Sequence, residues 1–231
     1  MEITKTNICA YVDHTNVKPD ATEGDIKKLC EEAVKYGFHS VCVTPYRVKV
    51  AREVLGSTQT AIICVVGFPF GFTTTEEKIN EAKIAIQDGA TEIDMVINIG
   101  AVKEEKWDFI KDEIRQIAEA AKPCGLKVIM EVGFLSEDEL KRACETARDA
   151  GAEFVKTSTG YGLRGTTVKD IEIMKEAVGN ECKIKASGGI QDFETAKTMI
   201  EAGVDRIGTS HALDIIGANE KKNEDKSGSN E

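Results

Sequence analysis

One pattern repeats along the whole chain and restricts the folds that the chain can adopt. Amphipathic stretches with helical spacing end near a glycine, and each glycine is followed by a short segment with strand character. Glycine suits the left-handed backbone position just past the end of a helix. The glycines are Gly37, Gly56, Gly89, Gly125, Gly151, Gly179 and Gly203, and the segments after them are 39–43, 60–66, 92–97, 127–132, 154–158, 183–187 and 205–208. The pattern therefore predicts seven strands that alternate with helices.

An opening strand at 8–13 raises the number to eight. Strands that alternate with helices predict an α/β protein with a parallel sheet. Eight such units in 231 residues favour a closed (β/α)₈ TIM barrel, for which about 250 residues is typical. A doubly wound open sheet is the alternative, and it is weaker because no Gly-x-Gly-x-x-Gly motif follows the first strand.

The chain shows no linker that would divide it into two domains. We expect a single barrel domain over 1–217, followed by a disordered polar tail over 218–231. The tail expectation rests on 219–231, which contain no apolar residue. Helix starts within the barrel are marked by capping-box spacing at Ser136 with Glu139 and at Thr74 with Glu77.

Charge and cysteine content exclude several classes of function and compartment. The chain has 30 Lys and Arg against 40 Asp and Glu, a net charge of −10, which disfavours nucleic acid and anionic membranes as partners. No signal peptide opens the chain, and no apolar run approaches the roughly 20 residues of a membrane span. Seven scattered cysteines without a Cys-x-x-Cys pair indicate neither a disulfide framework nor a zinc cluster. We therefore expect a cytoplasmic protein.

Alternation along the strands places charged side chains inside the barrel. Successive side chains of a strand point to opposite faces, and the face that packs on the helices must be apolar. In 183–187 the outward positions are Ile184 and Ala186, so Lys185 points inward. The same logic turns Asp94, Lys156, Asp13 and Cys42 inward, each from a different strand.

Interior charge has a structural and a catalytic interpretation. A single interior lysine is usually half of an ion pair, and we expect Glu92 and Arg206 to form one such pair low in the barrel. Lys156 and Lys185, however, lie on neighbouring strands about 4.8 Å apart. Two ammonium groups so close lower the pKa of at least one of them, and a neutral lysine can attack a carbonyl and form an imine. Asp94 would supply a carboxylate for proton transfer in the same cavity.

Two loops suggest a phosphate site beside these lysines. The seventh strand ends in Ser187-Gly188-Gly189 and the eighth in Gly208-Thr209-Ser210, while Gly160 follows the sixth. Loops after strands seven and eight are the usual phosphate-binding place in a TIM barrel, because their backbone N–H groups can approach an anion. Ordinary turn chemistry explains either loop alone, and both together favour phosphate.

The histidines do not suggest a metal site. His14, His39 and His211 share no ligand spacing, so we expect neither a metal nor another cofactor. His14 is expected at the mouth of the barrel or at a strand end. Trp107 and 68–70 are expected to serve packing and loop structure.

Several motifs resemble those of the deoxyribose-phosphate aldolase family. They are Val12-Asp13-His14-Thr15, Gly67-Phe68-Pro69, Thr73-Thr74-Thr75, 92–98, 154–160, 185–190 and 206–210, in the family's order along the chain. The resemblance implies a class I aldolase that interconverts 2-deoxy-D-ribose 5-phosphate with D-glyceraldehyde 3-phosphate and acetaldehyde. It implies that Lys156 is the Schiff-base lysine, that Asp94 donates and accepts protons, and that Lys185 is the partner of Lys156.

The resemblance also implies a small phosphorylated sugar and aldehydes as ligands, with Asp13, Thr15 and Cys42 as candidates for the substrate pocket. A homodimer or a larger homo-oligomer is compatible with it. Gln191 and His211 depart from the family pattern next to the phosphate loops, so they bear on phosphate affinity. Another phosphosugar aldolase or isomerase, or a barrel that binds phosphosugars without turnover, remain the alternatives.

Overall fold

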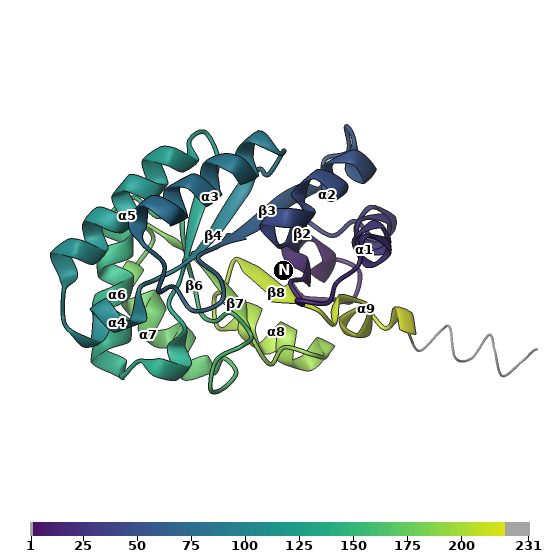
Figure 1. Ribbon diagram of the computed structural model, residues 1–231. Coiled ribbons are helices and arrows are strands. Elements are labelled where there is room, and N and C mark those ends of the chain that lie inside the picture. Colours follow the sequence, from purple (N-terminus) through teal and green to yellow (C-terminus); the bar gives the residue numbers. More distant parts are fainter. Residues whose placement is uncertain (1, 220–231) are drawn as a thin grey trace, which may run out of the picture.

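Eight parallel strands close into a barrel in the computed structural model, which describes residues 2–219 (Figure 1). They pair in sequence order and β8 returns to β1, so the predicted TIM barrel is confirmed. The strands are β1 (Val12–Asn16), β2 (Ser40–Val43), β3 (Ala61–Val66), β4 (Glu92–Val96), β5 (Gly125–Ile129), β6 (Phe154–Lys156), β7 (Lys183–Ser187) and β8 (Arg206–Thr209).

Helices surround the barrel on its outside (Figure 1). They are α1 (Glu23–Tyr36), α2 (Val48–Leu55), α3 (Thr75–Gln87), α4 (Ile99–Lys103), α5 (Trp107–Ala121), α6 (Glu137–Asp149), α7 (Val168–Val178), α8 (Phe193–Glu201) and α9 (Ala212–Ile215), with 3₁₀ turns η1 (Ile8–Tyr11), η2 (Pro45–Arg47) and η3 (Val132–Phe134). The main core lies between the two layers, where Ile110, Ile114 and Ile117 of α5 are fully buried. Burying a side chain of this size stabilises the fold by about 1.5–3 kcal/mol.

Local sequence signals mark where most helices begin and end. Ser136 accepts a hydrogen bond from the N–H of Glu139 and completes a capping box at α6, while Thr74 accepts from Glu77 at the start of α3. Gly37 follows α1 with φ 68°, as expected of a left-handed cap. Gly125 differs from the expectation: α5 ends at Ala121, and Gly125 is already the first residue of β5.

The prediction for the first strand was wrong in its position. Residues 8–11 form the 3₁₀ turn η1, and β1 starts at Val12, whose partner on β8 is Ile207. The apolar start of this segment suggested a strand, but Ile8 is buried in the main core from a turn, where the N–H of Ile8 donates to the carbonyl of Thr4.

Of the polar tail expected at 218–231, residues 220–231 lie outside the described part of the chain. Ala218 and Asn219 are described and helical, and the side chain of Asn219 donates a hydrogen bond of 2.6 Å to Asp214. Over residues 2–219, no helix is long and apolar enough to span a membrane.

Candidate active site

The interior of the barrel is filled by a network of charged side chains. Its cations are Lys127, Lys156, Lys185 and Arg206, and its carboxylates are Asp13, Glu92 and Asp94. Interiors of TIM barrels are ordinarily packed with branched apolar residues. Here each charge has at least one opposite partner within 4 Å, which offsets the cost of burying it.

Asp94 is the centre of this network. Lys156 and Lys185 each donate to the same oxygen, Oδ2, at 2.8 Å, and Lys127 lies 3.2 Å from the other oxygen. Burial alone would raise the pKa of Asp94, but the three ammonium groups outweigh burial and hold this pKa well below its usual range. Asp94 is therefore an anion shared between the two lysines that the alternation pattern brought together.

Lys185 is not the lysine whose pKa its neighbour lowers. It is fully buried, and it contacts Asp13 at 2.6 Å in addition to Asp94. Burial on its own would lower the pKa of Lys185, but the two carboxylates outweigh burial and raise the pKa above its usual range. Lys185 is therefore a fixed cation, and the pKa of this member of the pair is not lowered.

Asp13 also occupies a different place from the one expected. It faces inward but is fully buried and does not line the cavity. Arg206 donates to it at 2.6 Å, and so does the hydroxyl of Ser40. Its role as a substrate-pocket residue is thus corrected: Asp13 lies below the pocket and fixes the position of Lys185.

The predicted pair of Glu92 and Arg206 is confirmed at 3.4 Å, and Lys127 contacts the same carboxylate. Lys127 was not among the predicted site residues. The alternation of Leu126, Lys127 and Val128 contained the signal, since Leu126 and Val128 belong to the main core and leave Lys127 inside.

The charge balance of the network identifies one lysine as different from the others. The network holds one cation more than it holds carboxylates, so loss of a single proton makes it neutral. Counting partners over residues 2–219, Lys185 pairs with two carboxylates and so does Lys127, whereas Lys156 pairs with Asp94 alone. Within the described part of the chain, Lys156 is also the one charged member of the network that lines the cavity.

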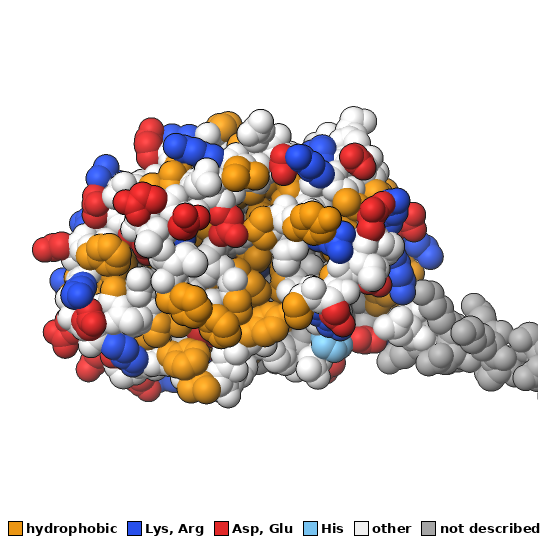
Figure 2. All heavy atoms as spheres, in the orientation of Figure 1, with side chains coloured by type: hydrophobic (Ala, Val, Ile, Leu, Met, Phe, Trp, Pro, Cys, Tyr) orange, Lys and Arg blue, Asp and Glu red, His pale blue; other side chains and the backbone are white. Residues whose placement is uncertain are grey.

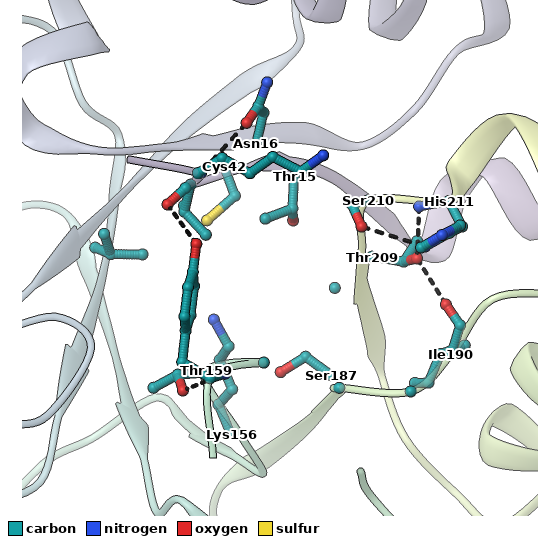
Figure 3. Close-up of a pocket in the computed structure, with 18 of the residues that line it drawn as sticks. Thr15, Asn16, Cys42, Lys156, Thr159, Ser187, Ile190, Thr209, Ser210 and His211 are labelled. Carbon is teal, nitrogen blue, oxygen red and sulfur yellow. Dashed lines mark hydrogen bonds between the residues drawn. The ribbon is translucent and has the colours of Figure 1, made fainter. Parts of the chain in front are cut away.

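A cavity of about 300 Å³ opens above Lys156 at the carboxyl ends of the strands (Figure 3). The ε-amine of Lys156 points into it, facing Cys42 and Thr15 on one side and Ser187 and Ser210 on the other (Figure 3). Thr15 and Cys42 therefore line the pocket as expected. Burial raises the pKa of the Cys42 thiol, although Lys185 and Lys156 oppose the shift, so Cys42 stays protonated at neutral pH.

The glycine-rich loops after β6, β7 and β8 all contribute to the lining of this cavity. Its lining includes Gly160, Gly188, Gly189, Gly208 and Ser210, all of which the sequence had suggested. Gly188 and Gly189 have φ values of 89° and 80°, a backbone conformation that favours glycine. Glycine at position 208 has a steric cause, because a Cβ atom there would lie 3.0 Å from Cε of Lys185. Gly208 thus leaves room for the side chain of Lys185.

Glu131 is a second residue of the site that was not predicted. It follows β5 with φ 56°, an uncommon value outside glycine, and is almost fully buried. Its carboxylate accepts hydrogen bonds from the N–H and the hydroxyl of Thr159, which lines the cavity. Glu131 therefore holds the loop after β6 in position.

The other residues considered in the sequence, His14, Trp107 and Phe68, serve mainly in packing and hydrogen bonding. His14 is buried and bonded to Glu32 at 2.9 Å, and burial lowers its pKa in spite of this partner. Trp107 and Phe68 pack against apolar clusters, and Phe68 also borders the cavity. Residues 2–219 contain no group of three or more His, Cys, Asp or Glu side chains arranged to hold a metal ion.

The buried carboxylates make acid stability a test of the network. The pKa values of Asp13 and Asp94 are lowered, and that of Glu92 falls to about 2 because its partners, His39, Lys127 and Arg206, outweigh burial. A lowered folded-state pKa adds stability that is present above the unfolded pKa, about 4.3 for Glu, and is lost as the pH falls toward the folded value.

Glu92→Gln should therefore be less stable than the native protein at pH 7, and the difference should shrink as pH falls from about 4 toward about 2. The difference changes by at most about 1.4 kcal/mol per pH unit, because one proton is involved. Urea unfolding at a series of pH values measures it. A constant difference down to pH 2 would contradict the ion-pair assignment of Glu92.

Comparisons with known proteins agree with this geometry. A deoxyribose-phosphate aldolase of Thermococcus gammatolerans is 51% identical over 214 residues, which cover 91% of this chain and 95% of that protein. One of Aciduliprofundum boonei is 52% identical over 211 residues, covering 90% and 95%. The solved structure of a tetrameric deoxyribose phosphate aldolase from Aeropyrum pernix superposes with a TM-score of 0.87 at 30% identity, covering 95% of this chain and 93% of that one. The family model described as DeoC/LacD family aldolase matches residues 8–218. The chain belongs to the DeoC/LacD family of aldolases.

Proposed function

We propose that this aldolase cleaves 2-deoxy-D-ribose 5-phosphate reversibly to D-glyceraldehyde 3-phosphate and acetaldehyde, through an imine on Lys156. The observation that carries the proposal is the position of Lys156, whose amine enters the cavity. Among residues 2–219, Asp94 is the one carboxylate paired with this amine, and Lys185 shares it as a fixed cation. The relatives of about 50% identity that bear the name of this activity support the same substrate.

The reaction begins when the neutral amine of Lys156 attacks C1 of the open-chain sugar phosphate. Water leaves, and the imine that forms accepts electrons from the C2–C3 bond. As that bond breaks, the C3 hydroxyl loses its proton and glyceraldehyde 3-phosphate departs. The enamine left on Lys156 takes a proton at C2, and water then hydrolyses the imine to release acetaldehyde.

Protons for these steps come from the groups next to the lysine. Asp94 accepts hydrogen bonds from both amines at 2.8 Å, so it can relay a proton between Lys156 and a water molecule in the cavity, while Lys185 keeps its charge and holds Asp94 in place. The phosphate at C5 would lie against the loops of Gly188, Gly189 and Gly208 to Ser210, with backbone N–H groups as donors.

A coupled assay tests this proposal. Purified protein with 2-deoxy-D-ribose 5-phosphate should release glyceraldehyde 3-phosphate. An added isomerase converts this product to dihydroxyacetone phosphate, and an added dehydrogenase reduces that to glycerol 3-phosphate with measurable loss of NADH. EDTA should leave the rate unchanged, since the imine itself is the electron sink. No product from this sugar, but turnover of another phosphosugar, would reject the substrate assignment. Loss of activity in EDTA, restored by a divalent metal, would reject the imine mechanism.

We further propose a homo-oligomer in a reducing cytoplasm. The oligomer is supported by the Aeropyrum pernix relative, which is described as tetrameric. The reducing compartment is supported by the cysteines of this chain, all seven of which are free thiols. A solution mass by light scattering equal to one 25.1 kDa chain would reject the oligomer. Fractionation of the source cells that finds the protein outside the cytoplasm would reject the compartment.

A further inference from the structure

Tyr161, in the loop after β6, separates the catalytic cavity from a second cavity. The second cavity has a volume of about 350 Å³ and is predominantly apolar, and its walls include Phe70, Phe72 and Phe134. Among the described residues, Tyr161 is the one that lines both cavities. Hydrophobic side chains gather in the middle and lower part of the face shown in Figure 2, and several aromatic residues of the second cavity are exposed.

Contacts with two other loops, and one within its own loop, hold Tyr161 in this position. Its hydroxyl donates a hydrogen bond of 3.1 Å to the carbonyl of Val17, just after β1. Its ring meets the ring of Phe68, after β3, edge to face with centroids 5.6 Å apart and planes at 88°. Its N–H donates to the hydroxyl of Thr159, which Glu131 holds in turn. The ring is therefore fixed between the loops that follow β1 and β3.

The end of the catalytic cavity that Tyr161 closes is apolar. Cys42, Ile63 and Val65 form a small buried cluster inside the barrel, and Val17 and Phe68 pack against it. The glycine loops proposed to hold the C5 phosphate provide another part of the same lining. A sugar anchored by its phosphate and joined to Lys156 at C1 directs its C1–C2 unit toward the apolar end. In the reverse reaction, this unit is the aldehyde that becomes the enamine.

We propose that Tyr161 determines the size of the aldehyde that forms the enamine, by closing the apolar end of the catalytic cavity against the second cavity. This inference rests on the proposed function. Acetaldehyde, with two carbons, fits in front of the ring. Propanal carries one more carbon on C2, and this carbon meets the ring of Tyr161. The ring keeps the extra carbon out of the second cavity, which lies on its other side. One methylene in an apolar pocket changes discrimination by roughly 10- to 200-fold.

The bond that forms is the same with either aldehyde. C2 of the enamine on Lys156 attacks C1 of glyceraldehyde 3-phosphate, whose carbonyl oxygen takes a proton, and water then frees the product from the lysine. With propanal the product carries a methyl group on C2. No oxidant, reductant or further reactant enters, so the choice of aldehyde depends on space alone.

Tyr161→Ala joins the two cavities and should raise the ratio of kcat/KM for propanal to that for acetaldehyde about tenfold or more, with glyceraldehyde 3-phosphate as acceptor. Tyr161→Phe is the matched control, because it keeps the ring and its contact with Phe68 and loses only the bond to Val17. Its ratio should stay within about threefold of the native value.

A second measurement does not depend on turnover. Equal concentrations of propanal and acetaldehyde are offered together, borohydride reduces the imines, and mass spectrometry gives the ratio of the two adducts on Lys156. This ratio should shift toward propanal in Tyr161→Ala and stay unchanged in Tyr161→Phe.

Three outcomes would overturn the inference. In the first, the propanal-to-acetaldehyde ratios of kcat/KM and of adducts stay at the native values in Tyr161→Ala. In the second, these ratios rise in Tyr161→Phe as much as in Tyr161→Ala, which would assign selectivity to the hydroxyl. In both cases, reaction of the native enzyme with acetaldehyde leaves the proposed function intact. Failure of the native enzyme to join acetaldehyde to glyceraldehyde 3-phosphate would instead reject the proposed function and this inference with it.

Discussion

Lys156→Ala should abolish turnover of 2-deoxy-D-ribose 5-phosphate, with a loss of about 10⁴-fold or more in kcat. The imine needs an amine inside the cavity, and the other lysines of the network are buried below it with two carboxylates each. The fold should persist, because Asp94 keeps Lys127 and Lys185 as partners. Release of glyceraldehyde 3-phosphate measures the first effect and the midpoint of thermal unfolding the second.

Covalent trapping shows whether Lys156→Ala loses activity because the imine can no longer form. With acetaldehyde and borohydride, the native enzyme should gain a two-carbon adduct on Lys156, and Lys156→Ala should gain none. Lys83→Ala, at an exposed position on α3, is the control and should behave as the native enzyme does. An adduct on another lysine of the native enzyme, or full activity of Lys156→Ala, would remove Lys156 from the mechanism.

Lys185→Leu should weaken both the fold and the reaction at neutral pH. Removing one partner of a buried ion pair costs about 3–5 kcal/mol, because Asp13 and Asp94 lose a fixed cation. Asp94 is then left to Lys156 and Lys127, and the stronger pairing favours the ammonium form of Lys156. The pH at which the rate reaches half its maximum should therefore rise, and the rate at pH 7 should fall.

Lys78→Met separates these two effects. Lys78 forms a fully buried pair with Glu113 at 3.0 Å on the helical side of the sheet, between α3 and α5. Its loss should destabilise the protein by a similar amount without moving the pH profile. Urea unfolding and rates between pH 5 and 10 measure both properties. An unchanged profile in Lys185→Leu would mean that Lys185 does not influence the protonation of Lys156.

The inward direction of the central charges could be predicted from the sequence because it depends on one strand at a time. Ile184 and Ala186 pack on the helices, which leaves Lys185 inside whatever its neighbours are. The same alternation holds for Lys127, which lies between the outward-facing Leu126 and Val128. The eight alternating units likewise follow from local signals, such as the capping box at Ser136 and the glycine after α1.

The partners of each charge depend on the closed barrel and could not be predicted in this way. Alternation placed Lys156 and Lys185 on the same face, but the register between strands puts Asp94 between their amines and gives Lys185 a second carboxylate in Asp13. That arrangement raises the pKa of Lys185, so Lys185 is not the lysine whose pKa the close pairing was expected to lower.

Contacts between distant loops are a second feature that could not be predicted from the sequence. Tyr161 and Val17 are 144 positions apart, and no pattern in either segment relates them. They meet because closure of the sheet brings the loops after β1, β3 and β6 around one mouth. The sequence by itself determined which residues face the interior, since that follows from the two-residue period of a strand. The tertiary structure decided which charges pair and which loops touch, since these depend on the stagger of eight strands around a closed barrel.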